Sequence, residues 1–351
     1  MTEERCLEMD AATAHLDRGW DLLHRGDLAA ARMSANRVLK LNPESPDAYT
    51  LLGAIAATDG EPEEALELFR QAMDLDPEHL DAFLYAADLY VHSFADFENA
   101  LHLCDEAEAL VSEQEETLDL LLLRAETWIA IGDLDHACQI ASHLPSPPYP
   151  AAAYYLRAGR ILLEVGKVGP ARDLLQQALL DPDTLLDSHY YLGVALEGEG
   201  KSTEAFEHFV RVYELEKALP MPSWAFSDAE FSELVGGAID SLPPLVFDLV
   251  KGVPVKVLDY PSLEMISEGL DPRAMVFLSG LAQTGTHRAA EASPAPQINC
   301  IFVYKRNVER FTRSKTEIAK EVGKAMGQET ALFFNLASDT GAEERCLGLD
   351  S

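Results

Sequence analysis

The sequence predicts an α-helical superhelix of about six helical hairpins over residues 12–217, followed by a small α+β domain over residues 224–340. Three observations lead to this prediction. Small residues recur with a period of about 34 residues through the first part of the chain. Two prolines, Pro220 and Pro222, then rule out a continuous helix, because proline lacks the amide donor that a helix interior needs. Short runs of β-prone residues follow that point.

The repeat rests on two series of small residues that keep the same phase. The first series is Gly19, Gly53, Ala87, Ala125, Gly159 and Gly193, and the second is Ala31, Ala65, Ala100, Ala137, Ala171 and Ala205. Two helices can cross closely only where both carry a small side chain, and larger residues such as Leu52 and Phe69 then fill the gaps on either side. Each hairpin leaves an apolar face uncovered, so successive hairpins are expected to stack.

The second unit of the repeat is the most complete. It carries Tyr49, Leu52, Gly53, Ala65, Phe69, Ala72 and Pro77. These residues and their spacing resemble the signature of the tetratricopeptide repeat, a helix–turn–helix unit. The resemblance covers about residues 12–217. A proline-rich stretch at 142–150 interrupts the pattern, and we expect a rigid turn there because the 34-residue period resumes after it.

The resemblance implies a concave groove lined by the first helix of each unit, with partner-facing residues at the second, fifth, ninth and twelfth positions. The predicted protein-binding residues are Leu16, Trp20, Thr50, Leu84, Asp88, Leu122, Glu126, Arg160 and Tyr190. The Lys and Asn set with which some members of the family clamp a C-terminal carboxylate is absent. We therefore expect a basic or amphipathic protein or peptide partner. The alternative is that these apolar side chains pack against neighbouring helices or against the second domain.

The charge balance excludes several classes of ligand. The 351 residues include 60 acidic and 27 basic ones, a net charge of −33, and 42 of the acidic residues lie in residues 1–218. Nucleic acids and anionic membranes attract clustered Lys and Arg, so neither is an expected partner. No apolar run approaches the ~18–20 residues of a membrane span, and no secretory signal is visible. Five scattered cysteines predict reduced thiols, so we expect a cytoplasmic protein.

Residues 224–340 show a different pattern, and residues 341–351 are assigned to a C-terminal tail. The predicted elements are a helix over 231–243, strands over 253–258, 275–278 and 300–304, and a helix from 314 or 315 to about 334. Residues 281–297 are rich in Ala, Thr, Ser, Pro and Gly and predict a loop.

Several short motifs occur here in a fixed order: Leu242-Pro243, Val253-Pro254-Val255, Asp259-Tyr260-Pro261-Ser262 and Tyr304-Lys305-Arg306-Asn307-Val308-Glu309. Their order resembles the minimal metallopeptidase-like domain, a small bacterial zincin. The resemblance spans about residues 225–340. It implies a catalytic helix that carries the H-E-x-x-H motif near the C-terminal end of the domain.

The zinc ligands are missing at the matching place. The chain has Gln328 and Leu332 where the family pattern has histidines. Glu329 matches the general base, and Asp339 stands where a third, acidic ligand would be. Zinc needs the two imidazoles four residues apart on one helix face, and neither glutamine nor leucine replaces them. We therefore predict no catalytic residues, no metal and no cofactor, and we expect Leu332 to fill the lost site by apolar packing.

Two functions from different classes remain open. The first is a non-catalytic interaction scaffold or adaptor, in which the repeat array is fused to a pseudo-metallopeptidase domain. The second is a metal-dependent peptidase with unusual ligands, whose repeats recruit substrate. The missing histidines favour the first. A local basic cluster of Lys305, Arg306, Arg310, Arg313 and Lys315 is either a solvated surface or a patch that docks on the acidic array or an acidic partner.

Overall fold

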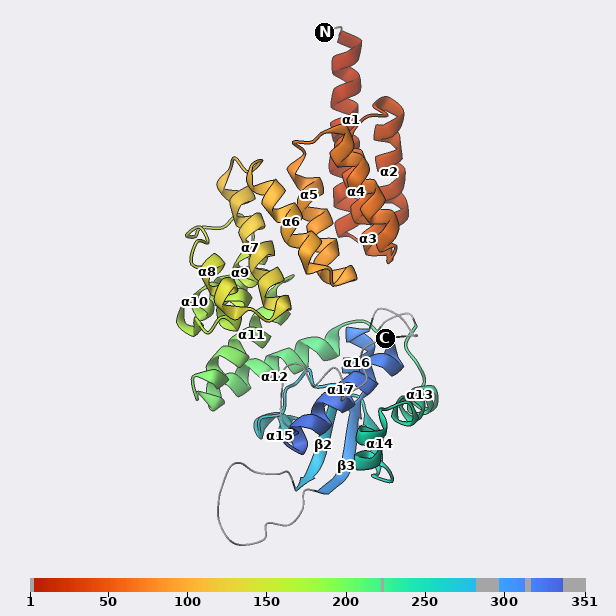
Figure 1. The fold of residues 1–351 in the computed structure, drawn as a ribbon, viewed down its shortest axis with the longest axis vertical. Helices are drawn as coiled ribbons and strands as arrows, with labels where there is room; N and C mark the ends of the chain where they lie inside the picture. The colour runs from red at the N-terminus through yellow and green to blue at the C-terminus, as the bar shows by residue number, and fades with distance from the viewer. Residues whose placement is uncertain (1–2, 222–223, 282–296, 313–316, 337–351) are drawn as a thin grey trace. The chain divides into compact units, whose positions relative to one another are not determined.

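A computed structural model describes residues 3–221, 224–281, 297–312 and 317–336, with side chains from residue 11 onward. The chain forms two compact units, residues 1–201 and 202–351. The first unit is wholly helical in its described part, and the second contains a three-stranded sheet. A helical repeat array followed by a small region with a sheet is therefore confirmed (Figure 1).

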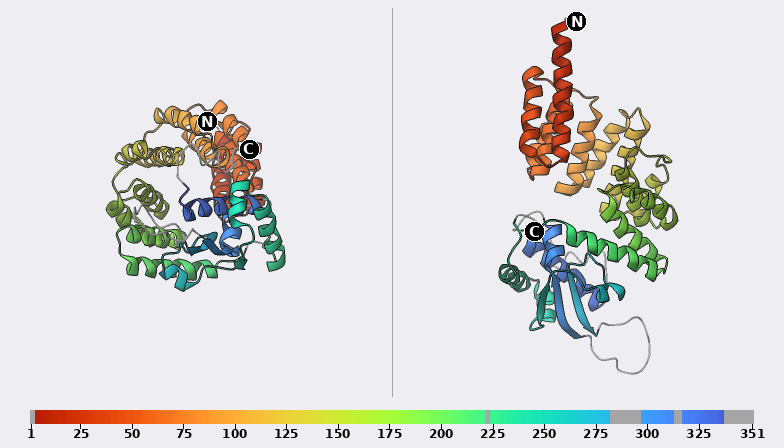
Figure 2. Two further views of the ribbon diagram at one scale, coloured as in Figure 1. Left: turned by 60° about the horizontal axis from the view of Figure 1, so that its bottom comes forward. Right: turned by 180° about the vertical axis from the view of Figure 1, so that it is seen from behind.

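The first unit consists of antiparallel helix pairs, each followed by the next along the chain (Figures 1 and 2). Its helices are α1 (Glu3–His24), α2 (Leu28–Leu41), α3 (Pro46–Asp59), α4 (Pro62–Leu75), α5 (Leu80–Leu89), a π-helical turn η1 (Tyr90–Phe94), α6 (Phe97–Glu108), α7 (Gln114–Ile131), α8 (Leu134–Ala141), α9 (Ala152–Glu164), α10 (Val168–Ala178) and α11 (Leu185–Gly198). The next helix, α12 (Ser202–Ala218), which the sequence places in the last hairpin of the array, belongs to the second compact unit.

The small residues lie where the two helices of a hairpin cross. Ala31, Ala65 and Ala171 are fully or almost fully buried. A methyl group added to Gly159 would come within 2.7 Å of Leu175 Cγ, and one added to Gly53 would collide with the ring of Phe69. The backbones can approach this closely only because these positions carry little or no side chain, which is the reason for the period seen in the sequence.

The turn inside each hairpin uses a residue with positive φ. Gly26, Gly60, Gly132, Gly166 and Gly200 all adopt φ between 75° and 86°, a conformation that costs glycine nothing. The third hairpin is different, because Ala95 occupies the same place with φ of 50°. A side chain there carries steric strain that glycine avoids.

The third repeat of the array is longer than the other repeats, and the structure shows where the extra residues lie. Ala87 and Ala100 are thirteen residues apart, whereas the equivalent pair of small residues in every other repeat is twelve residues apart. The single additional residue is absorbed by η1, since a π-turn takes one residue more than the α-helix that it interrupts. The remaining three residues lie between Ala100 and Ala125, where α7 begins eleven residues before its small residue Ala125, whereas α3 begins seven before Gly53.

The first helices of successive repeats form one layer. α1 contacts α3, α3 contacts α5, α5 contacts α7, α7 contacts α9, and α9 contacts α11. Each second helix packs mainly against its own hairpin partner and the first helix that follows. Because the first helices approach one another and the second helices do not, the first helices form the inner, concave layer of the array.

The proline-rich stretch at 142–150 separates α8 from α9. Tyr149 is buried within it, its hydroxyl donates to the carbonyl of Pro145 over 2.9 Å, and its amide donates to the hydroxyl of Tyr155 over 3.0 Å. The stretch is therefore packed against the first turn of α9.

The second unit places helices on a small mixed sheet. Its further elements are α13 (Asp228–Asp240), α14 (Pro244–Val250), β1 (Val255–Leu258), α15 (Leu263–Ser267), β2 (Val276–Leu281), β3 (Gln297–Tyr304), α16 (Lys305–Phe311) and α17 (Ile318–Phe333). The strand order is β1–β3–β2, with β1 parallel and β2 antiparallel to β3. The core lies between this sheet and α13, α14 and α17, and it includes Ile301, Val303 and Val276.

Candidate functional site

The inner face of the array is hollowed between α5, α7 and α9. A cavity of about 320 Å³ lies there, and we call it the α5–α9 cavity. It is lined by Asp81, Leu84, Tyr85, Asp88, Asp119, Leu123, Tyr154 and Arg157. The residues come from three consecutive first helices, which the repeat places side by side. The cavity therefore lies on the concave layer where the resemblance places partner-facing residues.

Three carboxylates line the α5–α9 cavity, and they differ in their partners. Asp81 makes no ion pair with any of the described residues. Asp88 lies 3.5 Å from Nε2 of His92. Asp119 accepts a hydrogen bond of 3.0 Å from the Tyr154 hydroxyl and lies 3.8 Å from Arg157. Burial raises the pKa of both Asp88 and Asp119, because a concave wall removes water from a charged group even where the group stays accessible.

The single arginine of the cavity is held from behind. Arg157 donates to both carboxylate oxygens of Glu126, from Nη2 over 2.7 Å and from Nε over 3.3 Å. Arg160 reaches the same carboxylate over 2.7 Å. Glu126 is buried, so its charge needs these two partners. The positive charge of Arg157 is therefore largely balanced by Glu126, and the cavity keeps a negative balance.

Aromatic rings form one end of the cavity. Tyr85 stacks on Trp20 of α1 at a centroid distance of 5.7 Å and on Phe69 at 5.8 Å. Trp20 of the first repeat contacts Tyr85 of the third repeat, and the second repeat carries the small Ala54 at the position equivalent to Trp20. Burial, together with the charges of Asp81, Asp119 and Asp88, raises the pKa of the Tyr85 hydroxyl to about 12, so this hydroxyl stays neutral.

The predicted groove residues have different surroundings. Leu84 and Asp88 line the α5–α9 cavity. Glu126 and Arg160 pair with each other. Thr50 and Leu122 are buried, and the Thr50 hydroxyl lies 2.9 Å from Nε2 of His79. Leu16 and Trp20 pack against an apolar cluster formed by residues of α2 and α3, which includes Ala31 and Leu51. Tyr190 packs edge-on against Tyr191, with 5.2 Å between the ring centroids.

Sequence reasoning missed most of the cavity. It did not select Asp81, Tyr85, Asp119, Tyr154 or Arg157. A signal was present, since Asp47, Asp81, Asp119 and Asp187 all occupy the second position of their units. Tyr85 and Arg157 occupy the sixth position, which points toward the same face one turn after the second.

The helix that resembles the catalytic helix is α17, and its packing contradicts one expectation. Leu332 is 75% exposed, so the prediction that it fills the lost site by apolar packing is wrong. The buried side of α17 carries Met326, Thr330 and Phe333 instead, and Gln328 lies with Leu332 on the exposed side. Burial raises the pKa of Glu329. Asp339 lies outside the described residues, and among those described no three His, Cys, Asp or Glu side chains are grouped to hold a metal ion.

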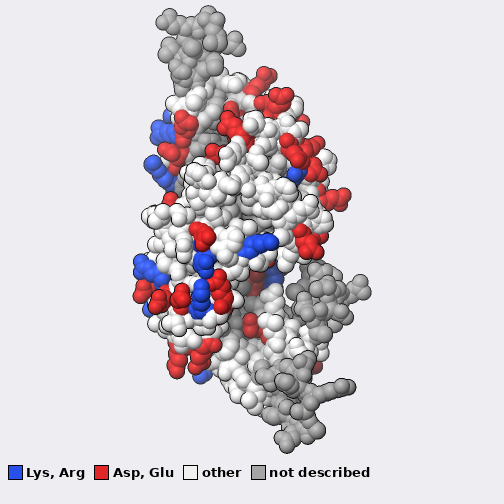
Figure 3. All heavy atoms as spheres, turned by 90° about the vertical axis from the view of Figure 1, so that its left-hand side faces the viewer, with Lys and Arg blue, Asp and Glu red and all other residues white. Residues whose placement is uncertain are grey.

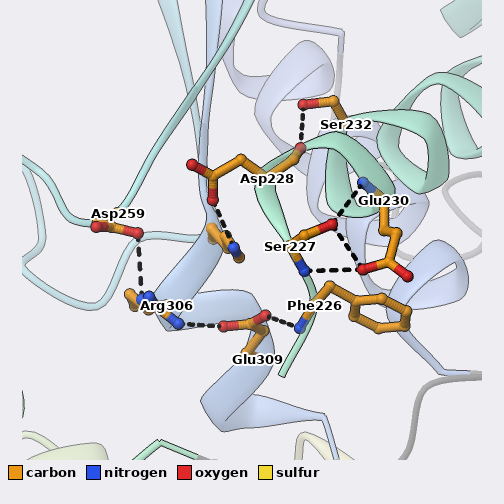
Figure 4. Close-up of polar contacts among 9 residues, drawn as sticks. Phe226, Ser227, Asp228, Glu230, Ser232, Asp259, Arg306 and Glu309 are labelled. Carbon is orange, nitrogen blue, oxygen red and sulfur yellow. Dashed lines mark hydrogen bonds and ion pairs between the residues drawn. The ribbon is translucent and has the colours of Figure 1, made fainter. Parts of the chain in front are cut away.

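The basic cluster is largely neutralised within the second unit. Lys305 is buried and its Nζ lies 2.6 Å from Asp228. Arg306 lies between Asp259 at 3.1 Å and the buried Glu309 at 3.0 Å, and Glu309 also accepts from the amide of Phe226 (Figure 4). Arg313 and Lys315 lie outside the described residues. The described part of the cluster is therefore structural, not a free docking patch.

Arg310 completes the network from α16 to α12. It lies 3.2 Å from Glu216, whose carboxylate also accepts from Arg273 over 3.1 Å. The Glu216 side chain is only 1% exposed. The hydroxyl of Tyr260 and Nη2 of Arg310 both donate to the Glu216 carbonyl. These contacts fix α12 to the second unit.

Comparison with known proteins supports the repeat assignment. A sequence model of the tetratricopeptide repeat family matches residues 16–79 and 59–115. Residues 16–115 therefore contain tetratricopeptide repeats. No curated protein matches the chain.

The solved structures with some likeness include two pilus proteins and a tetratricopeptide repeat protein. PilF from Pseudomonas aeruginosa is 16% identical, with 60% of this chain and 95% of that chain covered and a TM-score of 0.48. PilW, a type IV pilus biogenesis factor, is 14% identical over 59% and 94% with a TM-score of 0.48. A tetratricopeptide repeat protein from Parabacteroides merdae is 14% identical over 90% and 99% with a TM-score of 0.45. The assignment of residues 16–115 does not depend on them.

Two surface properties complete the description. No helix in the described ranges is both long and apolar enough to cross a membrane. On the face shown in Figure 3, acidic side chains are spread over the surface and basic ones lie among them.

Proposed function

We propose that the protein is an interaction module whose repeat array holds a basic, partly apolar segment of a protein partner on its concave face. The observation that carries this proposal is the α5–α9 cavity, which combines three aspartates with two leucines and two tyrosines on the inner helical layer. An acidic wall attracts a cationic partner, and an apolar floor gives the contact area that charge alone does not provide.

The charge of the array supports the same class of partner. Residues 1–218 contain 42 acidic and 15 basic residues. Such a field speeds encounter with a basic segment and repels an acidic one. Screening acts within about 8–10 Å at physiological ionic strength, so this contribution should fall as salt is added.

The proposal is tested with two labelled amphipathic peptides of equal length, one built from leucine and lysine and one from leucine and glutamate. We expect the full chain to bind the lysine peptide, measured by fluorescence anisotropy, and to bind it more weakly at higher salt. The glutamate peptide should not bind. Absence of binding to the lysine peptide at low salt would refute the proposal, and equal binding of both peptides would remove its electrostatic part.

For the second unit we propose a non-catalytic role as a pseudo-metallopeptidase domain. The replacement of both expected histidines by Gln328 and Leu332 supports this, since neither side chain supplies the imidazole that zinc requires. A metal-dependent peptidase with unusual ligands is the alternative. Purified protein should contain no stoichiometric zinc and show no chelator-sensitive proteolysis, and finding both would establish the alternative. The cytoplasmic location stays a prediction.

A further inference from the structure

We propose that the α5–α9 cavity binds one lysine side chain of the partner and discriminates against arginine at that position. This inference rests on the proposed function and names the chemistry that one part of the groove recognises. The cavity has a volume of about 320 Å³ and apolar, aromatic and charged walls, so it has room for a single side chain.

The apolar part of the cavity suits the stem of a lysine. Leu84 of α5 and Leu123 of α7 both line it. A lysine that enters would place its four methylene groups against these leucines and its ammonium group among the carboxylates. The aromatic ring of Tyr85 is already ordered by Trp20 and Phe69, so the wall needs little reorganisation on binding.

The polar part of the cavity suits an ammonium more than a guanidinium. Asp81 of α5 and Asp119 of α7 both line the cavity, whereas Asp88 lies two turns along α5 from Asp81, about 10 Å, too far for one ammonium to contact both. Two carboxylates on separate helices can each take one of the three N–H donors of an ammonium. A guanidinium instead prefers one carboxylate in a planar, two-point contact. That kind of contact is already made inside the array, between Arg157 and Glu126.

Arg157 adds to the discrimination. It lines the cavity and stays there because the buried Glu126 needs its charge. A second broad, planar cation would need room beside Arg157, whereas a compact ammonium can stay near Asp81. Asp81 has no ion pair among the described residues, so its negative charge is available to a ligand.

The test uses small probes that carry only the relevant group. n-Butylammonium, n-butylguanidinium and butan-1-ol are compared by ligand-observed NMR with the full chain. We expect n-butylammonium to bind, n-butylguanidinium to bind at least severalfold more weakly, and butan-1-ol not to bind. Bound n-butylammonium should be displaced by the leucine–lysine peptide. Equal binding of the two cations, or no binding of n-butylammonium, would overturn the inference.

Variants locate the site. Asp81→Asn and Asp119→Asn should each weaken n-butylammonium binding by about three- to tenfold, in the range between exposed and desolvated charge pairs. Asp74→Asn on α4 is the matched control, because Asp74 is exposed on a second helix and outside the cavity. Circular dichroism verifies that each variant keeps its helices. Unchanged binding in both cavity variants would refute the site.

The outcomes separate this inference from the proposed function. If the leucine–lysine peptide binds the wild-type chain while n-butylammonium does not, the array still binds basic segments but this cavity is not a lysine site. If neither probe binds, both proposals fail. Replacing the peptide lysines one at a time with Nε-acetyl-lysine gives a further check on the wild-type chain, because one position should lose far more affinity than the others.

Discussion

The charged side chains of α16 in the second unit and those of the α5–α9 cavity in the first unit differ in how completely they are paired. In the second unit, the described cations of α16 are each tied to a carboxylate of the same unit, and the Glu216 and Glu309 carboxylates are almost completely buried. In the first unit, packing of small residues holds the hairpins together, and Asp81 faces a cavity without an ion pair among the described residues. A charge cluster seen in a sequence therefore indicates a binding surface only where part of its charge stays unpaired in the fold.

The largest effect is expected from breaking the ion pairs of the second unit. Glu216→Ala leaves Arg273 and Arg310 without their buried counter-charge, and we expect a loss of about 3–5 kcal/mol in the free energy of unfolding. Urea denaturation of the full chain measures it. Glu214→Ala is the control, because Glu214 makes only an exposed pair with Arg211 and should cost about 0–1 kcal/mol. Similar losses in the two variants would mean that the Glu216 network is not structural.

The corresponding test in the first unit is overpacking. Gly53→Leu should cost about 1–3 kcal/mol, because its side chain collides with the Phe69 ring at the crossing of α3 and α4. Ala65→Leu on the facing helix should behave alike. Gly169→Ala meets no atom within 4 Å and serves as a neutral control. Unchanged melting temperatures for both Gly53→Leu and Ala65→Leu would contradict the role of the small residues.

A smaller effect follows from the strained turn of the third hairpin. Ala95→Gly should stabilise the protein by about 1 kcal/mol, because glycine adopts the positive φ found there without steric cost. Thermal unfolding measures the gain. The reverse change at an equivalent turn, Gly132→Ala, should destabilise by a similar amount. A loss of stability in Ala95→Gly would show that the Ala95 side chain makes a contact worth more than the strain.

The smallest effect concerns Asp88, whose replacement is expected to stabilise the fold, whereas replacement of Glu216 destabilises it. Burial raises the folded-state pKa of Asp88, so its ionisation opposes folding once the pH rises above its unfolded value of about 4. Asp88→Asn should therefore raise the free energy of unfolding at pH 7 by well under 1 kcal/mol, with a slightly higher melting temperature, and the gain should vanish near pH 4. The same raised pKa predicts that binding of the lysine peptide weakens as the pH falls, since Asp88 and Asp119 become neutral earlier than ordinary aspartates. A lower melting temperature for Asp88→Asn at pH 7 would contradict this.

The helical array could be predicted because its packing requires particular residues at a fixed period. Glycine and alanine at the crossings cannot be replaced by larger residues, so they mark each unit in the sequence. The one extra residue between Ala87 and Ala100 was visible in the sequence, but the π-turn that accommodates it was not predicted. The α5–α9 cavity was not predicted, because its lining depends on how far each first helix is rotated against the next, which the period does not determine.

The second unit was harder to predict. The strands and the last helix were located, but their register and direction depend on long-range pairing that short β-prone runs do not encode. Leu332 was assigned to the wrong side because it was aligned with a family motif. The apolar stripe of Ile318, Val322, Met326 and Phe333 gives the buried side of α17 directly and does not include Leu332.

The stack of Trp20 on Tyr85 has a consequence for how the array unfolds. Repeat proteins usually behave as a chain of units in which each senses only its immediate neighbours, so their ends fray one unit at a time. Trp20 belongs to the first repeat and Tyr85 to the third repeat, so their contact bypasses the second repeat. The first three hairpins should therefore lose protection against hydrogen exchange together, as one cooperative block, and Trp20→Ala should restore stepwise fraying from the N-terminal end.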